Sequence, residues 1–242
     1  MPRDFYGRDF FEKLILASVL PGVAGAMNAV GFFVVGVYTS HMTGLVARVG
    51  DDLAKESYSE VGKIVAFIAA FFLGAFVCAA LVEFGSVRNR GRYFVPLMIE
   101  AMVLALFAID TRAAEAAHAG HFLVPGLLLC FAMGLQNALV TKISGAVVRT
   151  THLTGVVTDL GIETFHLLRH GSRGFALLKD DPEYARMRIH LTIISSFFAG
   201  AVVGPFLYLR WGADAMFLPV AVVISLALYD VSRGIRPRPL LG

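Results

Sequence analysis

Charged side chains are scarce in this sequence. Asp, Glu, Lys and Arg make up only 16% of its 242 residues, whereas apolar residues make up 57%. An ordinary soluble domain carries about 25% charged and about 45 to 50% apolar residues, so the composition argues against a soluble enzyme and against a disordered chain. The net charge of +3 is too small to indicate a nucleic-acid partner. We therefore expect the chain to lie in a lipid bilayer.

Cysteine is also scarce, with only Cys78 and Cys130 in the chain. Both lie within apolar runs and neither has a CxxC or Cys/His spacing, which argues against a disulfide framework or a zinc site. The loop at residues 171–188 is polar and basic and lacks a nucleotide-binding, GxSxG or HExxH motif. No catalytic residue, metal or cofactor is therefore predicted.

Long apolar runs, by contrast, are abundant. A membrane-spanning helix needs about 20 mostly apolar residues. Runs of this kind, nearly free of charge, cover residues 14–47, 64–82, 93–109, 116–141, 189–209 and 215–229. The sequence predicts an all-α integral membrane protein with six transmembrane helices. The first run is longer than one crossing requires, which indicates a further element after about Val37.

The positions of Lys and Arg predict the orientation. Cytoplasmic loops are enriched in these residues, and most of the 21 basic residues fall in alternate segments that include both ends of the chain. We expect both termini to be cytoplasmic.

The two halves of the chain resemble each other. The pattern HxTGxVxxxG occurs at residues 41–50 and again at 152–161. Further matches in the same order are Gly25 with Gly134, Asn28 with Asn137, Gly36 with Gly145, Phe71 with Phe197, Gly74 with Gly200, and Phe94 with Phe217. These matches predict two membrane repeats, residues 1–115 and 116–242, each with three helices and a short HxTG segment.

An odd number of crossings per repeat places the second copy upside down relative to the first. Inverted repeats are typical of secondary transporters, whose solute site lies near the midplane between the repeats. Asn28 and Asn137 lie at similar depths on helices that enter from opposite faces, so we expect them to face a common central region.

Each HxTG segment is expected to form a short helix that either re-enters the membrane or lies at its interface. Helix N-termini attract anions and carboxylates, and His41 and His152 can hydrogen-bond a solute or carry a proton. A structural role for both histidines stays open. The residues expected to line the solute path are Asn28, His41, Thr43, Gly44, Gln136, Asn137, His152, Thr154 and Gly155.

Four charged residues in or near the apolar runs are candidates for charge pairing or proton coupling. Arg48 and Asp159 occupy equivalent positions with opposite charge, which indicates either an ion pair between the repeats or two solvated helix ends. Glu100 lies inside the third apolar run without a charged neighbour and is either a coupling or solute-binding group or an acid hydrogen-bonded within the bundle. Glu163 shares a helix face with Asp159 and His166, but this single ExxH segment does not predict a metal site.

The motifs resemble those of the YoaK-like bacterial membrane proteins, a family of unknown function. The resemblance rests on SHMTG at residues 40–44, GLQNA at 134–138 and TTxxTG at 150–155, and it covers nearly the whole chain. It implies a six-span protein of the bacterial inner membrane. The chain departs from the family at Leu45, where members commonly have Asn. A weaker similarity, to one half of a major facilitator transporter, rests on the basic loop at 85–92.

The leading interpretation is a permease or channel for a small polar or anionic solute, acting alone or as a homodimer, rather than an enzyme. One alternative is a membrane scaffold or accessory subunit that handles no solute. A less favoured one is a membrane enzyme that uses His152, Asp159, Glu163 and His166.

Overall fold

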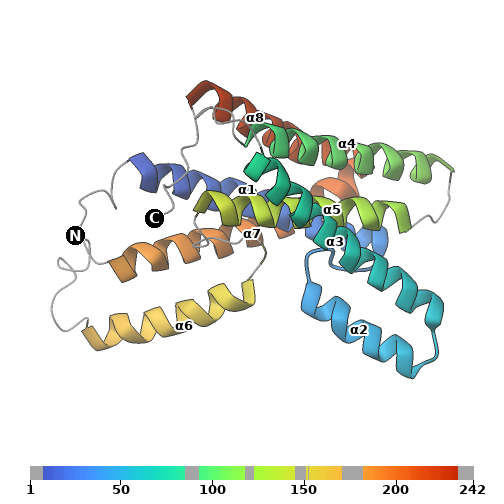
Figure 1. Ribbon diagram of the computed structural model, residues 1–242, viewed down its shortest axis with the longest axis horizontal. Coiled ribbons are helices and arrows are strands. Elements are labelled where there is room, and N and C mark those ends of the chain that lie inside the picture. Colours follow the sequence, from blue (N-terminus) through green and yellow to red (C-terminus); the bar gives the residue numbers. More distant parts are fainter. Residues whose placement is uncertain are drawn as a thin grey trace.

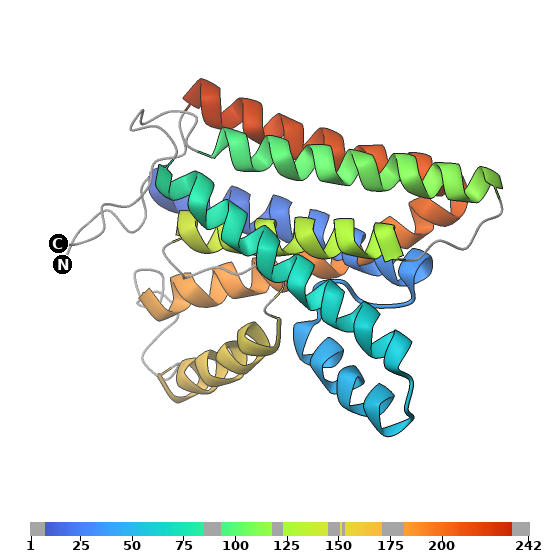
Figure 2. The same cartoon turned by 45° about the vertical axis from the view of Figure 1, so that its right-hand side comes forward.

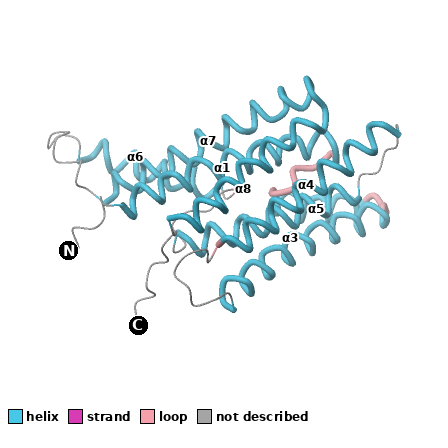
Figure 3. The backbone as a smooth tube through the Cα atoms, turned by 90° about the horizontal axis from the view of Figure 1, so that it is seen from above, coloured by secondary structure: helices cyan, strands magenta, loops and turns pink. Residues whose placement is uncertain are grey.

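The computed structural model describes residues 8–84, 93–117, 123–144, 151, 153–170 and 182–233. All regular structure within these ranges is helical (Figures 1 and 3). The elements are α1 (Arg8–Val35), α2 (Met42–Ala54), α3 (Tyr58–Phe84), α4 (Phe94–Ala117), α5 (Leu123–Ser144), α6 (Leu153–His170), α7 (Pro182–Trp211), the 3-10 turn η4 (Gly212–Met216) and α8 (Phe217–Arg233).

Five stretches of the described chain are long and apolar enough to cross a membrane. They are Ser18–Val35, Tyr58–Phe84, Phe94–Ala117, Leu123–Lys142 and Tyr184–Ser232. The last stretch has 49 residues and contains α7, η4 and α8. These findings confirm the predicted class, an all-α protein that crosses a lipid bilayer several times.

The long helices run roughly alongside one another (Figures 1 and 2). We call the end of the bundle where α1 begins and α8 ends the Arg8 end, and the opposite end, where α1 stops and α3 and α5 begin, the Val35 end. The most extensive contacts join α1 to α7, α3 to α5 and α4 to α8. The shorter α2 and α6 lie on one side of the bundle, and they pack mainly on α3 and α7, respectively.

The first apolar run contains two helices because a glycine ends α1. Gly36 has a φ of +76°, the left-handed conformation that commonly terminates helices. Its N–H donates to the carbonyl of Phe32 at 2.9 Å. The chain then turns back along residues 36–41 and begins α2 at Met42. This turn accounts for the excess length of the run beyond Val37.

Backbone contact between α1 and α7 depends on glycine. A Cβ atom on Gly25 would overlap the Phe197 carbonyl, and one on Gly200 would overlap the Gly22 carbonyl. Small residues at such positions let membrane helices approach closely and gain packing energy. This crossing therefore tolerates no side chain at Gly25 or Gly200 without a shift of the backbone.

The crossing of α3 and α5 has the same construction. A Cβ on Gly74 would overlap the Phe131 carbonyl, and one on Gly134 would overlap the Phe71 carbonyl. Gly74, Phe71 and Gly134 are the sequence matches of Gly200, Phe197 and Gly25 in the other crossing. Matching residues of the two halves of the chain therefore make matching contacts.

Carboxylates tie α4 to α8 at one end of the bundle and to α7 and η4 at the other. At the Arg8 end, Asp230 Oδ2 accepts a hydrogen bond of 2.9 Å from the Tyr93 N–H, directly before α4. At the Val35 end, Glu115 accepts from the Tyr208 hydroxyl at 2.8 Å and from the Ala213 N–H at 3.2 Å. Arg112 adds an ion pair to Asp214 at 3.0 Å. These bonds fix where the chain turns between α7 and α8.

Candidate functional site

The N-terminal ends of α2 and α6 lie close to each other midway along the bundle (Figures 1 and 2). From there α2 runs toward the Val35 end and α6 toward the Arg8 end. We call the first turns of these helices, residues 42–44 and 153–155, the meeting ends. The first N–H groups of a helix have no partner within it, and together with the helix dipole they form a positive pole. Two such poles therefore lie near each other about halfway along the bundle, on the side that α2 and α6 cover.

Two equivalent asparagines hold the chain that leads into these ends. Asn28 of α1 accepts a hydrogen bond through Oδ1 from the Ser40 N–H at 3.0 Å. Asn137 of α5 accepts through Oδ1 from both the N–H of Thr151 at 3.2 Å and its hydroxyl at 3.0 Å. Ser40 and Thr151 each directly precede the histidine of an HxTG motif. The structure therefore assigns both asparagines to positioning the short helices.

Glycine in the first HxTG motif makes room for the histidine. His41 is exposed and precedes α2 at the N-cap position, without a side-chain capping bond. A Cβ on Gly44 would overlap the His41 ring. The imidazole therefore lies against the first turn of α2. His152, its match in the second motif, lies outside the described residues.

The remaining motif residues have different surroundings. Thr43 and Thr154 are exposed, and Gly44 and Gly155 are half-buried. The carbonyl of Thr154 accepts from the Thr158 hydroxyl at 2.9 Å within α6. The two threonine side chains are thus accessible at the meeting ends.

Of the two alternatives for Arg48 and Asp159, an ion pair or two solvated helix ends, the structure does not show the ion pair among the described residues. Arg48 Nε lies 3.4 Å from Asp52 Oδ2 on the next turn of α2, and its Nη2 lies 3.9 Å from Glu60 Oε2 of α3. Asp159 is exposed on α6. The equivalence of two sequence positions does not bring them together, because α2 and α6 diverge from their meeting ends.

Glu163 has a partner that the sequence did not identify. Its Oε2 lies 3.1 Å from Nδ1 of His190, and both side chains are about nine-tenths buried, with exposures of 12% and 9%. This contact ties α6 to α7 as Arg48 and Glu60 tie α2 to α3. His166 packs its ring near Phe165. No three His, Cys, Asp or Glu side chains of the described residues lie close enough to hold a metal ion.

Gln136 and Glu100 are among the polar side chains that are fully buried between the long helices. Gln136 Nε2 donates to the Leu20 carbonyl at 2.9 Å and so links α5 to α1, while its Oε1 has no partner in the described chain. Glu100 is completely buried on α4, and neither carboxyl oxygen has a hydrogen-bond partner among the described residues. An intramembrane acid of this kind is costly and typically functional.

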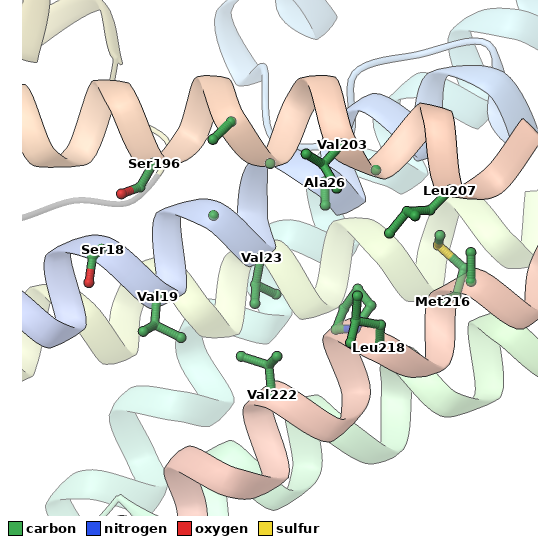
Figure 4. A pocket seen from close by; sticks show the side chains of 16 residues that line it. Ser18, Val19, Val23, Ala26, Ser196, Val203, Leu207, Met216, Leu218 and Val222 are labelled. Atoms are coloured by element: carbon green, nitrogen blue, oxygen red, sulfur yellow. The ribbon is translucent and has the colours of Figure 1, made fainter.

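An apolar groove of about 370 Å³ runs between α1, α7 and α8. Figure 4 shows Val23, Leu207, Met216 and Val222 along it, with the hydroxyls of Ser18 and Ser196 near one end. Its lining offers few polar groups for a hydrophilic solute. The groove therefore does not serve as a polar path.

Sequence reasoning missed three polar residues. His190 and Asp230 make contacts between helices, and Asp110 lines a cavity. His190 and Asp230 lie within or at the edge of apolar runs, where an ionisable residue is itself a signal. Their partners come from other helices, so no spacing along the chain could identify them.

Comparison with known proteins supports the conclusion that the chain is a membrane protein. The family model described as Protein of unknown function (DUF1275) matches residues 16–229. A relative named UPF0700 transmembrane protein YoaK, from Bacillus subtilis (strain 168), is 27% identical over 149 residues. The match covers 60% of this chain and 64% of that protein, so it spans slightly less than two thirds of the relative's length. No solved structure matches the chain.

Proposed function

Since this chain belongs to the DUF1275 family, and a relative is named a transmembrane protein, we propose that it is a permease or channel. It acts in the bacterial inner membrane and carries a small polar or anionic solute. The solute passes between the two repeats near the bilayer midplane. A scaffold or accessory role without a solute is the competing function, and it requires no polar path.

The observation that carries this proposal is the approach of the two meeting ends. Helices that begin at membrane depth leave backbone N–H groups that lipid cannot satisfy, so such ends occur where they face protein or a water-filled cavity. Discontinuous helices whose N-terminal ends point at a solute are a recurrent device in transporters. Thr43, Thr154 and His41 supply further polar groups at this place.

The topology that we propose has six crossings and two inverted repeats, residues 1–115 and 116–242. A straight helix of 49 residues would be about 74 Å long, against a hydrocarbon core of about 30 Å. The stretch from Tyr184 to Ser232 therefore supports two crossings joined at η4. The matching glycine contacts, between α1 and α7 and between α3 and α5, support the repeat. The positions of the basic residues favour cytoplasmic termini.

We also assign to the path two buried polar groups of the long helices, Glu100 on α4 and Gln136 on α5. A buried carboxyl without a partner can take up and release a proton during a transport cycle. Among the described residues the Gln136 Oε1 has no partner, so it is available to a solute or to water.

A homodimer would cover the outward faces of α2 and α6, where a Cβ added at Gly50 or Gly161 would meet no atom within 4 Å.

Osmotic swelling of proteoliposomes tests the proposal. Vesicles that contain the full chain are mixed with glycerol, urea, alanine, acetate or nitrate, and light scattering follows solute entry. We expect at least one solute to enter faster than in protein-free vesicles. The double variant Asn28→Ala/Asn137→Ala should lose this flux because both short helices lose their anchors.

Ser225→Ala is the matched control, because Ser225 is exposed on α8 and bonds only to the Ala221 carbonyl of its own helix in the described contacts. Its flux should equal that of the wild type. Entry rates equal to those of protein-free vesicles for every solute would favour the scaffold role instead.

A further inference from the structure

A second cavity, of about 700 Å³ and with a mixed charged and apolar lining, opens at the Val35 end of the bundle. The ends of α1, α3, α4 and α5 and one side of α2 surround it. Four charged side chains face it, Arg48, Glu60, Lys63 and Asp110, and the rest of its wall is apolar and includes Ile64 and Phe67. We call this cavity the charged vestibule. It is distinct from the meeting ends and from the apolar groove.

Asp110 brings an unpaired acceptor to the vestibule. Its side chain is half-buried, and Oδ2 is shielded from solvent without a hydrogen-bond partner among the described residues. A shielded carboxylate oxygen without a partner is costly, and a charged donor would satisfy it best. The vestibule thus presents a position for a positively charged group.

Arg48 brings unused donors to the same cavity. Its two ion-pair contacts, at 3.4 and 3.9 Å, do not meet hydrogen-bond geometry, and its side chain is 41% exposed. A guanidinium carries five N–H donors in a planar fork that matches a carboxylate. Lys63, in contrast, already bonds to Glu60 Oε1 at 2.7 Å. Arg48 therefore presents the better position for a carboxylate.

We propose that the charged vestibule binds a small zwitterion with an apolar body, of the amino-acid type. Its ammonium group bonds to Asp110, its carboxylate bonds to Arg48, and its apolar part lies against Phe67 and Ile64. A solute with only one charge satisfies only one of the two groups. That the bound zwitterion is also the transported solute rests on the function proposed above, whereas the binding does not.

Calorimetric titration of the full chain in nanodiscs tests this site with three probes that share one aromatic body. Phenylalanine carries both charges, phenethylamine only the ammonium and 3-phenylpropanoate only the carboxylate. We expect phenylalanine to bind at least about tenfold more tightly than either analogue, since each analogue lacks one of the two hydrogen bonds to a charged group.

Two variants separate the two ends of the probe. Asp110→Asn should weaken phenylalanine and phenethylamine by about tenfold and leave 3-phenylpropanoate unchanged. Arg48→Gln should weaken phenylalanine and 3-phenylpropanoate and leave phenethylamine unchanged. Asp51→Asn, an exposed acid on α2 outside the cavity, is the matched control and should change none of the three. Melting temperatures verify that each variant is folded.

Equal affinity for the three probes, no binding of any probe, or loss of all three in one folded variant would overturn the proposal. Probe binding without solute flux in proteoliposomes would support the proposed binding site and contradict the transport function. Solute flux without probe binding would support the transport function and contradict the binding site.

Discussion

Asn28 and Asn137 show how one side chain can set the position of a helix to which it does not belong. Each lies on a long helix and accepts the N–H of a residue just before a short one. From the sequence we expected both side chains to line a solute path, which stays a prediction. In the structure their Oδ1 atoms accept hydrogen bonds from Ser40 and Thr151. The match between the two halves of the sequence identifies this pair of asparagines, but only the structure identifies their hydrogen-bond partners.

Removal of the acceptor should therefore cost stability in either half. We expect Asn28→Ala and Asn137→Ala each to lower the free energy of unfolding by about 1 kcal/mol, the typical worth of such a bond. Asn28→Asp keeps an oxygen at the same place and should cost less. Circular dichroism during SDS-induced unfolding measures both. An Asp variant as unstable as the Ala variant would contradict this role.

The short helices α2 and α6 depend on contacts of unequal strength. Arg48 and Glu60 are each 41% exposed, so water screens their attraction, whereas Glu163 and His190 are about nine-tenths buried. Exposed pairs are worth about 0 to 1 kcal/mol. Buried hydrogen-bonded partners in contact show coupling of about 0.5 to 3 kcal/mol. We therefore expect α6 to be held to α7 more firmly by its pair than α2 is held to α3.

Double-mutant cycles compare the two attachments. The cycle of Glu163→Gln with His190→Leu should give a coupling energy of about 1 to 3 kcal/mol. The cycle of Arg48→Gln with Glu60→Gln should give less than about 1 kcal/mol. A coupling energy between Arg48 and Glu60 that equals or exceeds the one between Glu163 and His190 would show that burial does not determine which pair is stronger.

The glycine crossings allow a sharper comparison between two substitutions of the same type. Gly134→Ala places a Cβ against the Phe71 carbonyl and should destabilise the protein by about 1 to 3 kcal/mol. In Gly62→Ala, on α3, the added Cβ would meet no atom within 4 Å. This substitution should be neutral, or should stabilise the protein by up to about 1 kcal/mol because alanine has the higher helix propensity. Thermal unfolding of both variants checks the difference. Equal effects would argue against close backbone contact.

For the whole molecule, hydropathy correctly predicted an all-helical protein that crosses a membrane several times. The two inverted repeats stay a prediction. A bilayer forces apolar residues into long runs and leaves turns polar, so such features are local in the sequence. The end of α1 at Gly36 was indicated in the sequence only by the excess length of the first apolar run. The partners of Glu163 and Arg48 arise where different helices meet, as does the lack of a partner for Asp110 Oδ2 among the described residues. Composition carries no information on that geometry.

The proposed six crossings predict which loops face outward. Cys78 and Cys130 are fully buried, so the wild-type chain gives little background with a membrane-impermeant maleimide. In intact cells, Lys55→Cys and Asp214→Cys should react, because both positions are exposed at the Val35 end. Arg90→Cys and Ser172→Cys should react only after permeabilisation. Reaction of Asp214→Cys only after permeabilisation would contradict the sixth crossing.

The pairing of α1 with α7 bears on how the protein is made. During synthesis α1 enters the membrane long before α7 exists, so its glycine face has no native partner until the chain has been translated through Trp211. The contact between α3 and α5 can form earlier. Contacts between distant parts of a chain are slow to form. The second half of the chain thus completes a structure that the first half cannot reach alone, and a nascent chain that stalls before α7 would expose an unpaired helix to the membrane's quality control.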